Sequence, residues 1–174
     1  DKHKFIDMFD LFYHNNDPIR AKGLCQKVDS RYLIQNPPSL YLKTEELDAV
    51  SALNFERDLH PYHQKDGKVK ALETIKFSIS THQGCYGECS FCAISVHQGR
   101  TIRSRSEESI LKEAKLFTTY KDFKGIISDI GGPTANMYGY ECSKKLSKGT
   151  CEEKSCMFPT MCKALKPTHQ KQIE

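Results

Sequence analysis

The stretch ETIKFSISTHQGCYGECSFC, residues 73–92, decides the fold because it joins an alternating apolar pattern to a loop with three cysteines. Ile75, Phe77 and Ile79 occupy every second position, and polar or charged residues lie between them. A period of two is typical of a β-strand that buries one face. We therefore predict a strand over residues 73–80, followed directly by a loop of glycine and cysteine.

A helix and a second strand follow this loop. Residues 104–119 carry an apolar stripe at helical spacing, and Ser104 with Glu107, or Ser106 alone, can cap its start. The stripe consists of Ile110, Leu111, Ala114 and Phe117. Residues 123–132, FKGIISDIGG, are predicted to be a strand that ends in a glycine pair. Together these elements form a βαβ unit, for which we expect parallel strands and a right-handed crossover.

The segment before this unit is expected to be partly helical. Aromatic residues in FIDMFDLFY, residues 5–13, recur at helical spacing. A second helix is predicted over residues 44–53, with Thr44 as its N-cap. Residues 31–40 favour a short strand or an extended segment before Pro37 and Pro38.

Composition changes twice along the chain. The polar residues 57–70 are interpreted as a linker, with His60 and His63 at its surface. Residues 141–174 are rich in lysine and cysteine, and we expect no strand there. The chain thus divides into residues 1–70, a helical and extended segment with a linker; residues 71–140, the βαβ core; and the cysteine-rich residues 141–174.

The overall composition limits the possible partners. Of 174 residues, 38% are hydrophobic and 28% charged, which supports one modest core. No apolar run approaches the roughly 20 residues that span a bilayer, so no membrane partner is expected. Lysine and arginine outnumber acidic residues by only 26 to 22, so a nucleic acid partner is not indicated. No secretory signal is visible, and we expect a cytoplasmic protein.

Eight cysteines are present, and seven of them fall in one group of three and one group of four. A disulfide framework is typical of secreted chains with an even number of cysteines. An odd-numbered group in a chain without a secretory signal instead favours reduced thiolates that bind metal. Cys25 stands apart from both groups and is expected to be a small buried side chain.

The first group, Cys85, Cys89 and Cys92, lies directly after the first predicted strand of the βαβ unit. Ligands of parallel α/β structures collect at the carboxyl ends of the strands. Sulfur ligands select zinc, copper(I) or an iron–sulfur cluster. A structural zinc site takes four protein ligands. Three cysteines therefore indicate either a distant fourth ligand or an open coordination position at which chemistry occurs.

The spacing Cys-x3-Cys-x-aromatic-Cys, formed by Cys85, Cys89, Phe91 and Cys92, resembles the signature of radical S-adenosylmethionine (radical SAM) enzymes. Three segments, GCYGECSFCAISVHQGR, SRSEESILKEAK and SDIGGPTANMYG, are together similar to the radical SAM group known as the YgiQ family (UPF0313). QNPP and HPYH are weaker points of similarity. The resemblance extends from about residue 31 to residue 162.

This resemblance implies that the three thiolates bind three irons of a [4Fe–4S] cluster, whose fourth iron binds S-adenosylmethionine. One electron from the cluster would cleave the sulfonium and yield a 5′-deoxyadenosyl radical, which abstracts hydrogen from an unknown substrate. An electron donor such as a flavodoxin or ferredoxin is also implied. Phe91 would either shield one side of the cluster or pack in the core.

The glycine pair Gly131 and Gly132 occupies the place where radical SAM enzymes carry Gly-Gly-Glu, whose backbone contacts the amino group of S-adenosylmethionine. Pro133 replaces the glutamate here, so the resemblance implies a backbone contact without the acid contact. A tight turn is the plainer interpretation, since glycine adopts positive φ at little cost. Asp129 lies just before the pair, and its role is left open.

The loop HQGRTIRSR, residues 97–105, is basic. Arg100, Arg103 and Arg105 could bind carboxylates or phosphates of a substrate or cofactor. The alternative, that most of these arginines are solvated, is favoured. No pattern supports a metal role for His82 or His97.

The second group, Cys142, Cys151, Cys156 and Cys162, could close a sulfur-only site in a segment without a core of its own, since metal binding supplies folding free energy. Both zinc and an iron–sulfur cluster fit such a site. Some radical SAM enzymes carry auxiliary clusters, which favours the cluster. Four reduced, unligated cysteines are the alternative.

The sequence thus predicts an α/β chain with the opening βαβ unit of a partial radical SAM barrel, between a helical N-terminal segment and a cysteine-rich C-terminal segment. We expect an internal fragment of a radical SAM enzyme that is inactive in isolation, because most of the barrel would be missing. The alternative from another class is a non-enzymatic zinc-binding module whose partner is a nucleic acid or a protein.

Overall fold

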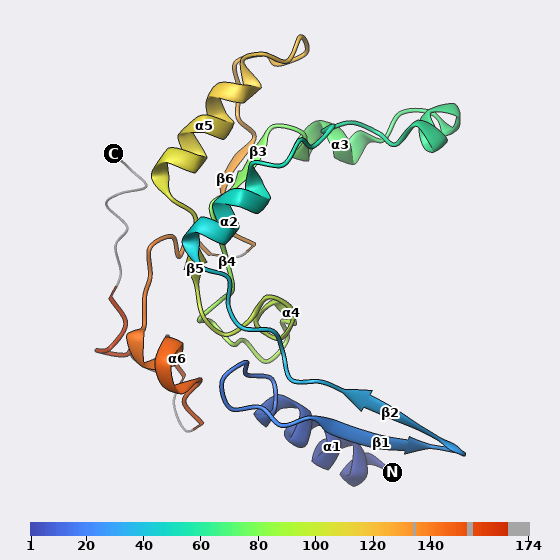
Figure 1. Ribbon diagram of the computed structural model, residues 1–174, viewed down its shortest axis with the longest axis vertical. Helices are drawn as coiled ribbons and strands as arrows, with labels where there is room; N and C mark the ends of the chain where they lie inside the picture. The colour runs from blue at the N-terminus through green and yellow to red at the C-terminus, as the bar shows by residue number, and fades with distance from the viewer. Residues whose placement is uncertain (134, 153–154, 167–174) are drawn as a thin grey trace.

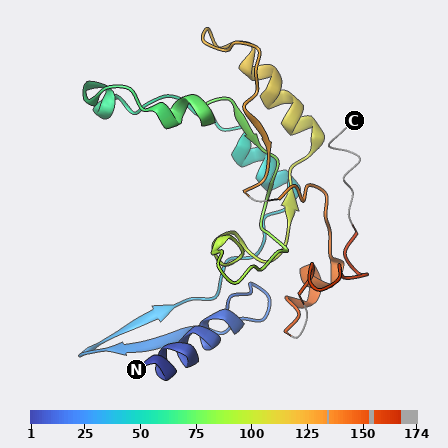
Figure 2. The same ribbon diagram turned by 180° about the vertical axis from the view of Figure 1, so that it is seen from behind.

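The computed structural model describes residues 1–133, 135–152 and 155–166. The helices are α1 (Lys2–His14), α2 (Thr44–Ser51), the 3₁₀ helix η1 (Pro61–Asp66), α3 (Lys70–Ile75), α4 (Ile94–Gln98), α5 (Glu107–Phe117) and α6 (Ser143–Lys148). The strands are β1 (Leu24–Val28), β2 (Arg31–Gln35), β3 (Ser78–Ser80), β4 (His82–Gln83), β5 (Arg103–Ser104) and β6 (Asp129–Gly131). The β1–β2 hairpin and the segment around α3 project away from a centre formed by β3, β6 and α5 (Figures 1 and 2).

The central feature is the βαβ unit β3–α5–β6. Strands β3 and β6 are parallel, with Ile79 opposite Ile130. The pairing continues past both strand ends through hydrogen bonds from Thr81 N to Gly131 O and from Ser128 N to Phe77 O, at 2.8 and 2.9 Å. The parallel unit predicted from the sequence is therefore confirmed, and a barrel beyond this opening unit stays a prediction.

Both strands are shorter than predicted. Residues 70–75 form α3, so Ile75 lies at a helix end and is 60% exposed, while Ile79 is buried. The prediction that these two side chains share a buried strand face is wrong. The reason is that β6 pairs only with residues 78–80, so the backbone groups before them form hydrogen bonds within a helix.

An aromatic cluster packs α5 against the sheet. Phe117 has no solvent exposure, and its ring centroid lies 5.4 Å from that of Phe77 and 5.9 Å from that of Phe123. The start of α5 is capped by Ser106, whose hydroxyl oxygen accepts a 3.1 Å hydrogen bond from Ser109 N. Capping by Ser106 alone, one of the two predicted alternatives, is therefore confirmed.

A buried ion pair reinforces the same contact. Arg105 donates to Ser80 O at 2.9 Å and also pairs with the carboxylate of Glu113, and both side chains are less than 10% exposed. Arg57 pairs with the same carboxylate, and its guanidinium lies 4.7 Å from the ring centre of Phe117. These contacts connect β3, α5 and the polar segment before α3.

The N-terminal region combines the predicted helix with a hairpin. Helix α1 is present, and β2 pairs antiparallel with β1, a strand that the sequence did not indicate. Cys25 lies on β1 opposite Ile34, and both are exposed. The predicted burial of Cys25 is therefore wrong, because all of β2 and all but the first residue of β1 are exposed.

The second helix begins at the predicted residue 44 and ends at Ser51, but its cap differs from the prediction. Thr44 is the first helical residue and not the N-cap, and its hydroxyl donates to Ser104 O at 3.1 Å. The carboxylate of Glu46 instead accepts a hydrogen bond from Lys43 N at 2.7 Å. Further along, the expected linker contains η1, and His60 and His63 are exposed as predicted.

The C-terminal segment folds back on itself, so that Lys166 lies beside Glu141. Within its described residues, α6 is followed by irregular chain, and Glu141 and Lys166 exchange two antiparallel backbone hydrogen bonds. This isolated bridge is the extended pairing seen there, in keeping with the prediction of no strand. In the described parts of the chain, no helix is long and apolar enough to cross a membrane.

Replacement of Phe117 tests the aromatic cluster. We expect Phe117→Ala to lower the free energy of unfolding by about 3–5 kcal/mol, because it leaves a cavity between α5 and the sheet. Leu116→Ala is the matched control, since Leu116 is 47% exposed on the same helix, and should cost no more than about 0.5 kcal/mol. Urea unfolding followed by circular dichroism measures both. Equal losses for the two variants would contradict this account of the core.

Candidate metal centre: the cysteine loop

The cysteine loop, residues 84–92, begins immediately after β4 and close to the carboxyl end of β3. The strands on either side of the loop, β4 and β5, pair antiparallel, with His82 opposite Ser104. In the chain between these two strands, Cys85 N donates a hydrogen bond to Gly99 O at 3.1 Å. Because β3 and β6 are parallel, the end of β6 with Gly131 reaches the same edge of the sheet. The loop therefore lies where ligands of parallel α/β structures collect.

The thiols of Cys85 and Cys89 lie on the same side of Gly87. A Cβ atom at position 87 would lie 3.3 Å from the sulfur of Cys85 and 3.5 Å from that of Cys89. The backbone N–H of Gly87 donates to the Cys85 sulfur at 3.3 Å. Cys92 follows in a turn, in which its N–H donates to Cys89 O at 3.0 Å. The structure thus brings together two of the three predicted ligands, and the third follows within one turn.

The three thiols do not form a closed ligand set. Among residues 1–133, 135–152 and 155–166, no three His, Cys, Asp or Glu side chains are close enough to hold a metal ion. Cys85 is buried, Cys92 is half-buried and Cys89 is exposed. The loop fits a sulfur-ligated group in the chemistry of its donors and in the approach of its first two thiols. Phe91 is 91% exposed, so the interpretation of Phe91 as a core residue is wrong.

A buried ion cluster is centred on one residue of the loop, Glu88. Glu88, between the first two cysteines, accepts hydrogen bonds from Arg100 Nη2 at 2.9 Å and from Lys145 Nζ at 2.8 Å. The side chains of these three residues are 7%, 8% and 1% exposed, respectively. Lys145 Nζ also donates to Arg100 O at 2.8 Å, and the Tyr13 hydroxyl lies 3.4 Å from the Glu88 carboxylate. The cluster thus joins α1, the loop and α6.

The charges of this cluster stabilise one another. Burial alone opposes ionisation of Glu88, but the hydrogen bond from Arg100 and the charge of Lys145 outweigh it and lower the pKa of the carboxyl. Burial likewise opposes the charge of Lys145, but the attraction of Glu88 exceeds it and raises the pKa of the amine. The backbone of Glu88 has φ +48°, a region unusual for a residue with a side chain. Such strain persists where surrounding contacts enforce it, and the ion pairs supply those contacts.

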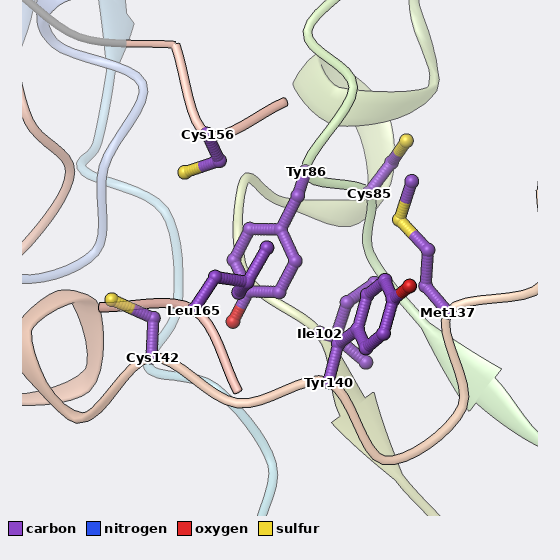
Figure 3. Close-up of a cluster of buried hydrophobic side chains, with 8 residues drawn as sticks. All are labelled: Cys85, Tyr86, Ile102, Met137, Tyr140, Cys142, Cys156 and Leu165. Atoms are coloured by element: carbon purple, nitrogen blue, oxygen red, sulfur yellow. The ribbon is translucent and has the colours of Figure 1, made fainter. Parts of the chain in front are cut away.

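Tyr86 connects the loop to the C-terminal segment. Its ring has no solvent exposure and lies in a buried cluster with Cys85, Ile102, Met137, Tyr140, Cys142, Cys156 and Leu165 (Figure 3). Lys145 Nζ lies 5.2 Å from the centre of this ring. Burial raises the pKa of the Tyr86 hydroxyl, so it stays neutral. The residue directly after Cys85 is therefore a core residue of the protein.

The second cysteine group contributes to the same core. Cys142 and Cys156 are each 6% exposed and lie around the Tyr86 ring (Figure 3). Cys162 packs at the edge of this cluster, whereas Cys151 lines a cavity between α1 and residues 150–152. Burial raises the pKa of the Cys156 thiol. Within the described residues these four cysteines form no metal site, and the structure does not bring them together as one ligand set.

Packing explains the second glycine of the pair, and neither glycine has the positive φ of a glycine-dependent turn. A Cβ atom at Gly132 would lie 2.1 Å from Nε2 of His82, whose side chain is buried. Neither Gly131 nor Gly132 is among the residues with positive φ, so the interpretation of a turn that requires such a backbone is wrong. His82 Nδ1 lies 3.0 Å from the Thr81 hydroxyl, and within the described residues Nε2 has no hydrogen-bond partner. Asp129 is exposed.

The expectation of solvated arginines is wrong for two of the three. Arg100 and Arg105 are each 6% exposed and lie in ion pairs, while Arg103 is partly exposed and donates to Leu42 O at 2.8 Å. Sequence reasoning also missed Glu88 and Lys145. An acidic residue between two cysteines was a signal for the former, but nothing distinguishes Lys145 from the other lysines of α6.

Substitution of Gly84 tests how tightly the loop begins. Gly84 has φ +84°, and a Cβ atom there would lie 2.0 Å from Thr101 O. Gly125 shares the positive φ, at +78°, but has open space around it. We expect Gly84→Ala to lower the free energy of unfolding by about 1–3 kcal/mol more than Gly125→Ala. Chemical denaturation compares the two, and equal costs would show that the loop tolerates the added atom.

The buried imidazole of His82 predicts a pH dependence. Burial lowers the pKa of His82 below its usual value of 6.5. Below pH 6.5 the unfolded chain therefore binds a proton that the native state excludes, and stability falls by at most about 1.4 kcal/mol per pH unit until the native pKa is reached. We expect His82→Gln, but not the exposed control His97→Gln, to reduce this slope in urea unfolding between about pH 6.5 and 5. An unchanged slope for His82→Gln would contradict the prediction.

Comparison with known proteins identifies relatives over the whole chain. Residues 1–78 match the family described as Radical SAM N-terminal. The chain is 56% identical over 174 residues to UPF0313 protein FN0734 of Fusobacterium nucleatum. This match covers 100% of this chain and 31% of that protein. A UPF0313 protein of Thermotoga petrophila is 48% identical over 170 residues, or 98% of this chain and 30% of the relative. A UPF0313 protein of Clostridium botulinum (strain Okra) is 46% identical over 172 residues, which are 99% of this chain and 27% of the relative.

No solved structure matches the chain. The chain spans about a third of the length of the curated relatives it matches. The match to the Fusobacterium nucleatum protein extends over the whole chain, so the matched range includes the cysteine loop, the βαβ unit and the C-terminal segment. Because its first 78 residues also match the N-terminal region of radical SAM proteins, the chain belongs to the UPF0313 family of the radical SAM superfamily.

Proposed function

We propose that the protein containing this chain is an enzyme that binds a [4Fe–4S] cluster through Cys85, Cys89 and Cys92 and reductively cleaves S-adenosylmethionine. The observation that carries the proposal is the approach of the Cys85 and Cys89 thiols on one side of Gly87, at the carboxyl end of β3, in a member of a radical SAM family. Three thiolates on a four-iron cluster leave one iron for a further ligand.

The chain's own residues prepare the loop for this role. Gly87 leaves open the space between two thiols, because any Cβ there would lie against both sulfurs. Its N–H donates to the Cys85 sulfur, and a hydrogen bond of this kind favours the thiolate. Cys92 follows Cys89 closely in sequence, and its backbone hydrogen bond to Cys89 keeps the two residues close in space. When bound, the cluster would supply the electron that cleaves S-adenosylmethionine, and the radical chemistry belongs to these cofactors.

The end of β6 is the second part of the proposed site. Gly131 pairs with Ser80 at the end of β3, and Gly132 packs against His82, three residues before Cys85. We assign the backbone of this glycine pair to the contact with S-adenosylmethionine, since small residues let a ligand approach the main chain closely. Pro133 stands where the superfamily carries an acid, so the contact depends on backbone atoms alone.

The remaining parts of the reaction lie outside this chain. The cluster needs an external one-electron donor of low potential, for which a flavodoxin or ferredoxin is suitable. The substrate, a small molecule or a macromolecule, would be selected by residues beyond the opening βαβ unit. The proposal therefore concerns the whole protein, and the isolated chain is not expected to turn over.

Anaerobic reconstitution with iron and sulfide of the full-length protein tests the proposal. We expect a brown protein with about four irons per chain, and formation of 5′-deoxyadenosine and methionine when dithionite and S-adenosylmethionine are added. Cys89→Ala should lose the cluster and the cleavage, because one of three ligands is gone. Cys25→Ala is the matched control, since Cys25 is exposed on the distant strand β1.

Two results would overturn the proposal. The first is undiminished cleavage of S-adenosylmethionine by the Cys89→Ala variant, which would place the cluster elsewhere. The second is a colourless protein that takes up stoichiometric zinc and is unchanged by S-adenosylmethionine, which would identify a zinc-binding module instead.

A further inference from the structure

The ion cluster of Glu88, Arg100 and Lys145 includes one residue of the proposed cluster-binding loop, Glu88, and its three charges do not cancel one another. Two cations share one carboxylate, and each of the three side chains is less than 10% exposed. The three charges therefore sum to one positive charge in a region that water does not screen.

We propose that this ion cluster sets the reduction potential of the iron–sulfur cluster held by Cys85, Cys89 and Cys92, with Glu88 as the residue that positions the loop. This inference rests on the proposed function. The three charged residues belong to this chain, and the Cys-x3-Cys-x-aromatic-Cys signature specifies none of them.

The position of Glu88 is the first support. It lies in sequence between Gly87, which the first two thiols face, and Cys89 itself. Its backbone is in the left-handed region, at φ +48°, and its carboxylate is held from both sides by Arg100 and Lys145. Since the ion pairs enforce this backbone conformation, the direction of the neighbouring Cys89 side chain depends on them.

The path from Lys145 to the first ligand is the second support. Lys145 Nζ lies 5.2 Å from the centre of the Tyr86 ring, and Tyr86 directly follows Cys85. Lys145 and Tyr86 are 1% and 0% exposed. The positive charge thus acts on the loop through buried protein, where Coulomb interactions are much stronger than in water.

One further acid lies near the ion cluster and offsets part of its positive charge. Asp17 is the next acid near Arg100, and its carboxylate accepts hydrogen bonds from the backbone N–H groups of Ile19, Arg20 and Thr150, at 2.9, 3.0 and 2.8 Å. The described structure records no ion pair between Asp17 and Arg100, but the negative charge of Asp17 attracts Arg100. Because Asp17 is the same in every variant proposed below, it does not change the direction of their effects. Cys156 contacts Lys145 as a neutral thiol, since burial disfavours its thiolate.

The sign of the effect follows from charge. Reduction adds one negative charge to an iron–sulfur cluster, and net charge around a cluster is one of the factors that set its potential. A nearby positive charge stabilises the reduced form more than the oxidised form and therefore raises the potential. Loss of Lys145 should lower the potential, and loss of the Glu88 charge should raise it.

The experiment measures midpoint potentials of the reconstituted full-length protein by redox titration followed by electron paramagnetic resonance. The variants are Glu88→Gln, Lys145→Met and the double variant. We expect Glu88→Gln to shift the potential upward and Lys145→Met downward. The double variant restores the wild-type sum of charges and should return toward the wild-type potential. Lys144→Met, an exposed lysine of the same helix, is the matched control and should leave the potential unchanged.

Opposite shifts that cancel in the double variant support the inference, because a loosened loop would shift both single variants in the same direction. Shifts of the same sign, or none larger than that of Lys144→Met, overturn it. If Glu88→Gln does not take up iron, Lys145→Met and the charge-preserving Lys145→Arg decide, since only the former should lower the potential. A wild-type protein without any cluster would overturn the proposed function itself, which separates the two failures.

Discussion

The buried ion cluster of Glu88, Arg100 and Lys145 is the interaction on which the arrangement around the cysteine loop depends. Its members come from the loop, from the chain after α4 and from α6, and the hydroxyl of Tyr13 adds α1. Removal of one partner from a buried ion pair leaves the other charge unpaired, at a cost of about 3–5 kcal/mol. The cluster therefore specifies which segments meet, and it does so beside the residues that carry the proposed chemistry.

Close packing is the second constraint on the site. Gly132 faces the buried ring of His82, so that position has no room for a side chain, and a Cβ atom at Gly87 would crowd the Cys85 thiol. Tyr86 fills the space between the loop and the C-terminal segment, where Cys142 and Cys156 surround it. Two members of the second cysteine group, Cys142 and Cys156, thus pack behind the first loop and contribute to the core without any metal.

The sequence predicted the βαβ unit well because its signals are local. The apolar stripe and the Ser106 cap of α5 follow from residues within a few positions of one another, and the parallel pairing of β3 with β6 follows from the helix between them. The predicted strand boundaries were wrong where pairing between the strands decided them, as at Ile75, which lies in α3 and not in β3. The burial of Cys25 was wrong because composition cannot show that β1 belongs to an exposed hairpin.

The sequence by itself determined the family, the order of the core elements and the cysteine spacing, because each of these is a pattern in a single contiguous stretch. Only the tertiary structure decided that Arg100 and Lys145 are buried, that Gly132 lies against His82, and that Cys142 and Cys156 pack around Tyr86. These contacts join residues 12–70 positions apart. A lysine on a short polar helix looks the same in sequence whether it faces water or a buried carboxylate. Burial and charge pairing are properties of the folded chain, so they became visible only when its segments were brought together.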